Sequence, residues 1–95
     1  KDLSHLIVFP NPANLKETNS IGFMNFPLNK KGRLKIYNLA GDLVFDRVIP
    51  ALTSVNYTYH WDMVNNAGNK VSSGMYLYII EMGGELKKGK FAIIR

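Results

Sequence analysis

Hydrophobic and polar positions alternate over short stretches of this chain, and turn-forming residues interrupt the pattern every eight to fifteen positions. The interruptions are Pro10-Asn11-Pro12, Asn29-Lys30-Lys31-Gly32, Ala40-Gly41-Asp42, Pro50, Asn65-Asn66-Ala67-Gly68-Asn69, Ser72-Ser73-Gly74 and Gly83-Gly84. No window keeps apolar residues at i, i+3, i+4 and i+7 for about three helical turns, so we expect at most a single helical turn. This spacing is typical of short strands in a sandwich or barrel.

Seven segments have the composition and alternation of β-strands. They are His5–Phe9, Ser20–Leu28, Arg33–Asn38, Leu43–Ile49, Val55–Trp61, Met75–Met82 and Lys87–Ile94. The second segment changes the parity of its apolar residues between Phe23 and Met24, which predicts a β-bulge. Gly41 lies in the loop between the third and fourth segments, and Gly83-Gly84 forms a hairpin turn between the last two. The polar segment Ala13–Asn19 is predicted to be a mobile loop.

Aromatic residues at period two indicate where the core lies. Tyr57, Tyr59 and Trp61 alternate along the fifth segment, so we expect that segment to supply much of the buried area. The residues expected to be largely buried are Trp61, Tyr76, Leu34, Ile36, Val44, Ile80 and Phe91. This strand count in a chain of 95 residues predicts an all-β, seven-stranded antiparallel immunoglobulin-like or fibronectin-like sandwich. The cystine of antibody domains is missing, which excludes a true antibody-type domain.

With 95 residues and a mass of 10.7 kDa, the chain forms one domain, 1–95, with a single core. Hydrophobic residues make up 46% and charged residues 20%, which favours folding over disorder. The absence of Cys excludes disulfides, thiolate metal sites and Cys nucleophiles. The longest apolar run, Met75–Ile80, is far shorter than the roughly 20 residues of a membrane-spanning helix. Because the chain begins at Lys1 without an initiator Met, we expect it to be a piece of a longer protein.

One run of residues carries a resemblance to a known family. Residues 60–80 read HWDMVNNAGNKVSSGMYLYII, and the motif positions are Trp61, Asp62, Asn65, Gly68, Val71, Gly74 and Tyr76. The run resembles the Ig-like domain named after the flagellar hook-capping protein and the C-terminal sorting domain of the type IX (Por) secretion system. The runs VFPNP at 8–12, IYNLAG at 36–41 and KKGKF at 87–91 are also similar to that family. Met63 stands where the family often has Gly, so the local turn geometry stays open.

The motif also has a structural interpretation that follows from its residue types. Trp61 is expected to plug one end of the core, and Asp62 to accept backbone N–H bonds in the following loop. Gly68 and Gly74 are expected to adopt backbone angles that a Cβ disfavours. Tyr76 is expected to enter the core while its hydroxyl holds a loop, as in a tyrosine corner. None of these roles involves a substrate.

Sequence support for a catalytic or metal site is weak. Four oxygen-bearing residues share one loop: Asp62, Asn65, Asn66 and Asn69. Calcium takes about 6–8 oxygen ligands, usually with several carboxylates, and this loop holds one, so we interpret it as a turn with calcium as the alternative. His5 and His60 have no third ligand spaced to join them, and Ser72-Ser73-Gly74 lacks the glycines that flank a nucleophilic Ser. We therefore expect no catalytic residue, no metal and no cofactor.

The net charge is +5, with a sequence pI near 9.6, and the basic residues form two clusters. They are Lys30, Lys31, Arg33 and Lys35 around the third segment, and Lys87, Lys88, Lys90 and Arg95 on the last. Solvated strand faces that block edge pairing explain such clusters. The alternative is an electrostatic contact with a secretion receptor or an anionic cell-surface polysaccharide. Nucleic acid is not an expected partner, because the aromatic residues belong to the core and not to a stacking platform.

The resemblance implies a non-catalytic C-terminal module of a secreted or cell-surface bacterial protein, which acts as a sorting and anchoring signal for the secretion machinery. The expected contact surface is the last two strands with Lys87, Lys88, Lys90 and Arg95. Two alternatives stay open. One is an accessory spacer, or a glycan- or protein-binding sandwich, that packs on a neighbouring catalytic or adhesive domain. The other is a structural assembly module.

Overall fold

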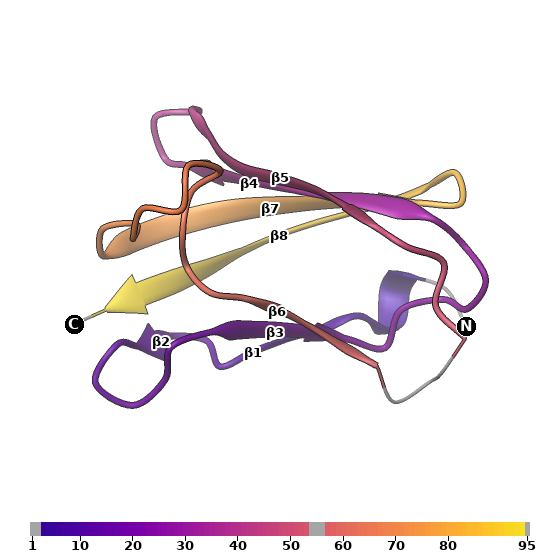
Figure 1. Cartoon of the computed structure of the whole chain (residues 1–95), viewed down its shortest axis with the longest axis horizontal. Helices are drawn as coiled ribbons and strands as arrows, with labels where there is room; N and C mark the ends of the chain where they lie inside the picture. Colours follow the sequence, from indigo (N-terminus) through magenta and orange to yellow (C-terminus); the bar gives the residue numbers. More distant parts are fainter. Residues whose placement is uncertain (1–2, 54–56, 95) are drawn as a thin grey trace.

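The computed structural model describes residues 3–53 and 57–94, which form two β-sheets and one 3₁₀ turn, η1 (Leu3–His5) (Figure 1). The strands are β1 (Ile7–Phe9), β2 (Ala13–Asn14), β3 (Ile21–Met24), β4 (Gly32–Asn38), β5 (Leu43–Ile49), β6 (Thr58–Trp61), β7 (Gly74–Met82) and β8 (Glu85–Ile94). Within the described ranges η1 is the only helical element, so the all-β class is confirmed.

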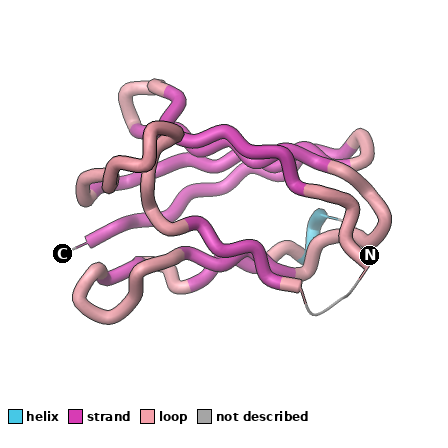
Figure 2. The backbone as a smooth tube through the Cα atoms, in the orientation of Figure 1, coloured by secondary structure: helices cyan, strands magenta, loops and turns pink. Residues whose placement is uncertain are grey.

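The two sheets face each other, and the chain crosses between them several times (Figures 1 and 2). The small sheet has the order β1-β3-β6, and both of its pairs are antiparallel. The large sheet has the order β2-β8-β7-β4-β5. Its pairs are antiparallel except for β2, which runs parallel to β8. Alternate residues of each strand therefore point into the space between the sheets, and the others point outward.

One strand lies where the sequence predicts a mobile loop. Ala13 and Asn14 form β2 and pair with Ile93 and Ile94 at the end of β8, and Ala13 is fully buried. The predicted seven-stranded, wholly antiparallel arrangement is therefore wrong for the described residues, which form eight strands with one parallel pair. A strand of two residues is too short to show a period-two pattern in the sequence.

The second predicted segment is interrupted where a bulge is expected. β3 ends at Met24, the next residue Asn25 has a φ of 68°, and Phe26 and Pro27 are buried outside any strand. The change of apolar parity thus marks the point where the chain leaves the small sheet. The register irregularity in the large sheet lies instead between β4 and β5.

Apolar side chains fill the space between the sheets, with aromatic rings at the centre. The Trp61 ring centroid lies 5.8 Å from that of Phe91, and Phe91 stacks on Tyr76 at 6.0 Å and on Tyr78 at 6.2 Å. Each such pair contributes about 0.5–1.5 kcal/mol beyond the burial of its area. The residues expected in the core are buried except for Val44, which is half-buried and does not share the inward parity of Phe45 and Ile49 on β5.

The fifth predicted segment contributes less to the core than expected. β6 begins at Thr58, and the predicted strand residues 55–56 lie outside the described ranges. Trp61 is 1% exposed, but Tyr59 is half-buried and Tyr57, which precedes β6, is 37% exposed. The long central strand β7 supplies more buried side chains than β6 does.

Candidate functional site

The motif run 60–80 carries the chain from the small sheet to the large one, because it covers the end of β6, the loop 62–73 and most of β7 (Figure 1). Trp61 ends β6, and its ring lies 6.3 Å from that of Tyr76 in the core. Its indole Nε1 donates a hydrogen bond to the Val64 carbonyl at 2.9 Å. One side chain therefore joins the core to the first turn of the loop.

Asn65 organises the tip of this loop. Its Oδ1 accepts the backbone N–H groups of Ala67 and Asn69, each at 3.0 Å. Gly68 lies between these two residues and has a φ of 86°, the left-handed conformation that glycine adopts without steric cost. The prediction that Asp62 accepts the loop N–H groups is wrong, since Asp62 is exposed and Asn65 takes that role.

Asn66 fastens the loop to the edge strand β5. Its backbone N–H donates to the Val44 carbonyl at 3.2 Å, and its Oδ1 accepts the Asp46 N–H at 3.1 Å. A single residue thus occupies two outward backbone groups of β5, as a neighbouring strand does.

Tyr76 and Met63 hold the two ends of the loop. The Tyr76 hydroxyl donates to the Ser72 carbonyl at 2.6 Å, which is the loop contact predicted for it, and Gly74 beside it has a φ of 150°. Met63 has a φ of 58° and is 1% exposed, and its carbonyl accepts the Val71 N–H at 3.0 Å. Left-handed backbone costs about 1–2 kcal/mol, and burial of a Met side chain offsets this with about 1.5–3 kcal/mol.

Two of the four oxygen-bearing side chains of the loop are engaged by the chain itself. Asn65 Oδ1 accepts two N–H groups of its own turn, and Asn66 Oδ1 accepts the Asp46 N–H of β5. In residues 3–53 and 57–94, no group of three or more His, Asp or Glu side chains is placed to hold a metal ion. His60 lies on β6 with its Nδ1 3.4 Å from Ser20 Oγ, whereas His5 belongs to η1. The hydrogen bonds of the motif therefore shape its own loop and fasten it to β5.

The run 8–12 carries the chain from the small sheet to the large one. β1 belongs to the small sheet and β2 to the large one, so Pro10-Asn11-Pro12 spans the gap. Asn11 Nδ2 donates to the Lys90 carbonyl at 3.3 Å, and Asn11 Oδ1 accepts the Ala92 N–H at 3.1 Å. Asn11 thus pairs with the outer edge of β8 as Asn66 pairs with that of β5.

The basic residues predicted as one contact cluster are divided between the two faces of β8. Lys88 and Lys90 are exposed and share the parity of the outward side chains. Lys87 has the opposite parity and is half-buried. Arg95 lies outside the described residues. Of the described members of the cluster, two therefore present their charge on the outer face of the large sheet.

Two basic clusters that are distant in the sequence meet on this outer face. Lys35 of β4 pairs in register with Ile79 of β7, and Ile79 pairs with Lys88 of β8. In the next row, Leu77 lies between Tyr37 and Lys90. We call this surface the β4-β7-β8 face, and it consists of Lys35, Tyr37, Met75, Leu77, Ile79, Lys88 and Lys90. The alternation of residues along each strand predicts which lysines share a side of that strand. Only the strand order shows that the lysines of β4 and those of β8 lie on the same face.

One ion pair lies at the edge of this face. Arg33 Nε and Nη2 donate to the two carboxylate oxygens of Asp46 at 2.6 and 3.2 Å. The hydrogen bond from Arg33 lowers the pKa of the Asp46 carboxyl group, and the same bond raises the pKa of Arg33. Among the described residues, Lys35, Lys88 and Lys90 have no acidic partner within 4.0 Å. The positive charge of the face therefore comes from these three lysines, of which Lys35 has Asp46 as its register partner on β5.

No helix in the described part of the chain is long and apolar enough to cross a lipid bilayer. The described residues form a two-sheet domain. Its β4-β7-β8 face carries lysines and apolar side chains, and the motif builds the loop 62–73 that connects the two sheets.

Two solved structures contain a domain similar to this chain. One is PorZ, an essential bacterial surface component of the type-IX secretion system of human oral-microbiomic Porphyromonas gingivalis, with a TM-score of 0.73 and 24% identity. The match covers 99% of this chain and 12% of PorZ. The other is dimeric latent PorU from Porphyromonas gingivalis, with a TM-score of 0.72, 25% identity and coverage of 94% of this chain and 9% of that one. The chain therefore spans about a tenth of each of these proteins. No curated protein matches the chain.

A family comparison covers almost the whole domain. Residues 4–94 match the CHU_C type IX secretion signal domain. This range includes the crossover at 10–12, the motif run 60–80 and the last strand, so the match extends over both sheets and their shared core. The chain belongs to the CHU_C type IX secretion signal domain family.

Proposed function

We propose that the domain is an immunoglobulin-like β-sandwich that sorts and anchors the longer protein carrying it, by presenting a surface to the type IX secretion machinery. The family match over residues 4–94 carries this conclusion. Because the family is that of a secretion signal, the protein is secreted or lies at the bacterial cell surface.

The signal domain itself is non-catalytic, and its residues are used for folding. The polar side chains of Asn65 and Tyr76 bind the backbone of the loop 62–73, and the Asn66 side chain binds the backbone of β5. We place the domain at the C-terminal end of its parent protein. The statement that the domain is non-catalytic does not extend to the rest of that protein. No described feature favours an anionic polysaccharide over a protein as the partner.

We assign the recognition surface to the last hairpin and the strand beside it. Lys88 and Lys90 are exposed on β8, and an exposed cluster of one sign steers encounter with an oppositely charged partner. Lys87, being half-buried on the other face, takes part less directly. Arg95 stays in the proposal as the next basic residue along the chain.

Export of a reporter tests this function. A soluble reporter fused to residues 1–95 is expressed in a bacterium with type IX machinery, beside the reporter alone and a fusion to an unrelated β-sandwich of similar size. We expect the first fusion in the medium or at the cell surface, and both controls inside the cell. In a strain that lacks the type IX machinery, the first fusion stays inside too. Equal export of the unrelated sandwich removes the proposed function.

A further inference from the structure

The β4-β7-β8 face has an apolar centre with charged flanks. β7 presents Met75, Leu77 and Ile79 in a column, and Met75 and Leu77 are 37% and 39% exposed. The outward face of an antiparallel sheet ordinarily carries polar residues when it meets water. Three apolar side chains therefore lie next to one another on the outward face, with lysines on the strands at either side.

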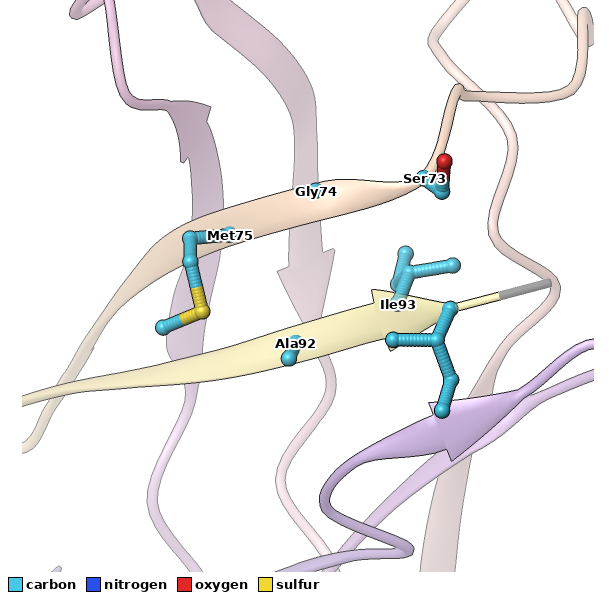
Figure 3. Close-up of a pocket in the computed structure, with 6 residues that line it drawn as sticks. Ser73, Gly74, Met75, Ala92 and Ile93 are labelled. Atoms are coloured by element: carbon cyan, nitrogen blue, oxygen red, sulfur yellow. The ribbon is translucent and has the colours of Figure 1, made fainter.

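Two hollows lie at the ends of this column. One of about 450 Å³ is at the start of β7, where Gly74 and Ala92 leave space beside Met75 (Figure 3). The other, of about 270 Å³, is lined by Tyr37, Ile79 and Leu86 together with the charged residues Arg33, Lys35 and Glu81. Hollows at the two ends of the column can accept individual side chains of a protein. A layer of lipid headgroups has no such projecting side chains. The relief of the face therefore favours a protein partner.

The lysines stand on both sides of the column. β4 and β8 flank β7, so Lys35 is separated from Lys88 by two strand spacings, about 9.5 Å. An α-helix with its side chains is about 10–12 Å across. A helix lying along β7 thus places its two flanks over Lys35 on one side and over Lys88 and Lys90 on the other.

We propose that the β4-β7-β8 face is the docking site for an acidic amphipathic helix of a partner protein. The apolar stripe of the helix covers Leu77 and enters the hollows, and its Glu or Asp residues on both flanks face the lysines. None of these lysines has an acidic group within 4.0 Å among the described residues, but Asp46, which binds Arg33, is the register partner of Lys35 and interacts with it electrostatically. The charges of Lys88 and Lys90 are therefore more available to the helix than that of Lys35. Glu81 is the next outward residue of β7 after Ile79. Because its carboxylate repels acidic side chains, the acidic residues of the helix end before this position. The inference rests on the proposed function, because it supplies the partner chemistry of the same signal surface.

A designed peptide tests the chemistry of the face. The probe is a fluorescent 18-residue helix with a Leu stripe flanked by Glu, and its binding to residues 1–95 is followed by anisotropy. We expect Lys88→Glu with Lys90→Glu to weaken binding about tenfold or more at low salt, and Leu77→Thr to weaken it as well. The control with the same charge change, Lys16→Glu with Lys70→Glu, lies off the face and leaves binding within about twofold. Lys35→Glu tests the other flank independently.

Two outcomes contradict the proposal directly. One is equal binding of the probe and of the same peptide with Gln in place of Glu. The other is binding of vesicles that contain phosphatidylglycerol, lost in the double lysine variant, with no binding of the peptide. Circular dichroism and thermal unfolding confirm that each variant keeps the wild-type fold before its affinity is compared.

Reporter export separates this proposal from the proposed function. If the double lysine and Leu77 variants export the reporter at the wild-type level while the unfused reporter stays inside, the docking face is wrong and the sorting function stands. If the unfused reporter is exported equally well, the sorting function is wrong, and the peptide measurement alone decides the docking face.

Discussion

Gly89 leaves the space that an aromatic ring occupies. It pairs in register with Tyr78 of β7, and a Cβ at position 89 would overlap the Tyr78 ring, whose Cε2 and Cζ would be 2.5 Å away. Tyr78 is 6% exposed and stacks on Phe91, so its ring has little freedom to move. The same burial raises the pKa of the Tyr78 hydroxyl. The glycine in the closing run 87–91 is thus a packing requirement.

Replacement of Gly89 by Ala is expected to lower the free energy of unfolding by about 1–3 kcal/mol, because the added methyl group overpacks the core. Urea denaturation of the wild type and of Gly89→Ala measures the difference. In a double-mutant cycle, Tyr78→Leu makes room for the methyl group, so the cost of Gly89→Ala falls in that background. A cost that is the same in both backgrounds means that the ring is not the obstacle.

At the scale of residues, the role of a side chain could be predicted where only one residue type in the loop suits that role. Trp61 and Tyr76 are large and carry one polar atom each, so burial with a hydrogen bond to the loop follows from their type. Asp62 and Asn65 are both short acceptors that suit the same turn, and the sequence does not distinguish them. The structure assigns the turn to Asn65.

At the scale of elements, asparagine residues cover the free backbone of β8 beside the short edge strand β2 and that of the edge strand β5. Exposed strand edges are templates for unwanted pairing with another chain. Asn11 binds the backbone of β8 at Lys90 and Ala92, and Asn66 binds that of β5 on the opposite edge. Each asparagine offers both a donor and an acceptor to the strand, and thus imitates one residue of a neighbouring strand.

Amide exchange tests this edge pairing. In Asn11→Ala, the Ala92 N–H loses its acceptor and should exchange with solvent at least about tenfold faster than in the wild type. In Asn66→Ala, the Asp46 N–H should respond in the same way. Each variant is the control for the other, since the amide on the far edge keeps its protection. Unchanged exchange at Ala92 in Asn11→Ala shows that β2 alone protects this edge.

Element prediction succeeded where strands are long and alternate regularly. β4, β5, β7 and β8 begin and end within one or two residues of the predicted segments, because seven or more residues give a clear period of two. β2 has two residues, and its pairing with β8 depends on a chain crossover that no local pattern records. β3 ends early because Asn25 turns the chain toward the other sheet.

At the scale of the molecule, Trp61 joins the two sheets. It ends β6 in the small sheet, and its ring lies against Phe45, Tyr76 and Phe91, which belong to three strands of the large sheet. Trp61→Ala is expected to lower the free energy of unfolding by about 3–5 kcal/mol, out of about 5–15 kcal/mol for a domain of this size. Thermal unfolding measures the loss.

Trp61→Phe is the matched control, because it keeps a ring and loses the hydrogen bond to the Val64 carbonyl. It should therefore unfold at a temperature between those of the wild type and Trp61→Ala. A Trp61→Ala variant that melts within a degree or two of the wild type contradicts the placement of this residue at the centre of the core.

The candidate site was only half visible in the sequence. The outward lysines of β8 follow from parity, but the apolar column between them and Lys35 depends on β7 lying between β4 and β8. Strand order is set by contacts between distant segments, so the local pattern of a single sequence does not reveal it. Lys87 shows that a cluster of charges in the sequence need not share one surface. It belongs to the basic run 87–91, but its side chain is not on the β4-β7-β8 face.

The attachment of the first residues to the last strand has a consequence for synthesis. Leu3 donates to Glu85, Asn11 binds Lys90 and Ala92, and β2 pairs with the end of β8. These segments can form their contacts only after the ribosome has made β8, which is the last strand of the domain. The face that bears Lys88 and Lys90 cannot form on a prematurely terminated polypeptide. The recognition surface proposed on β8 therefore forms only after nearly the whole domain has been made, and a polypeptide that ends before β8 lacks it.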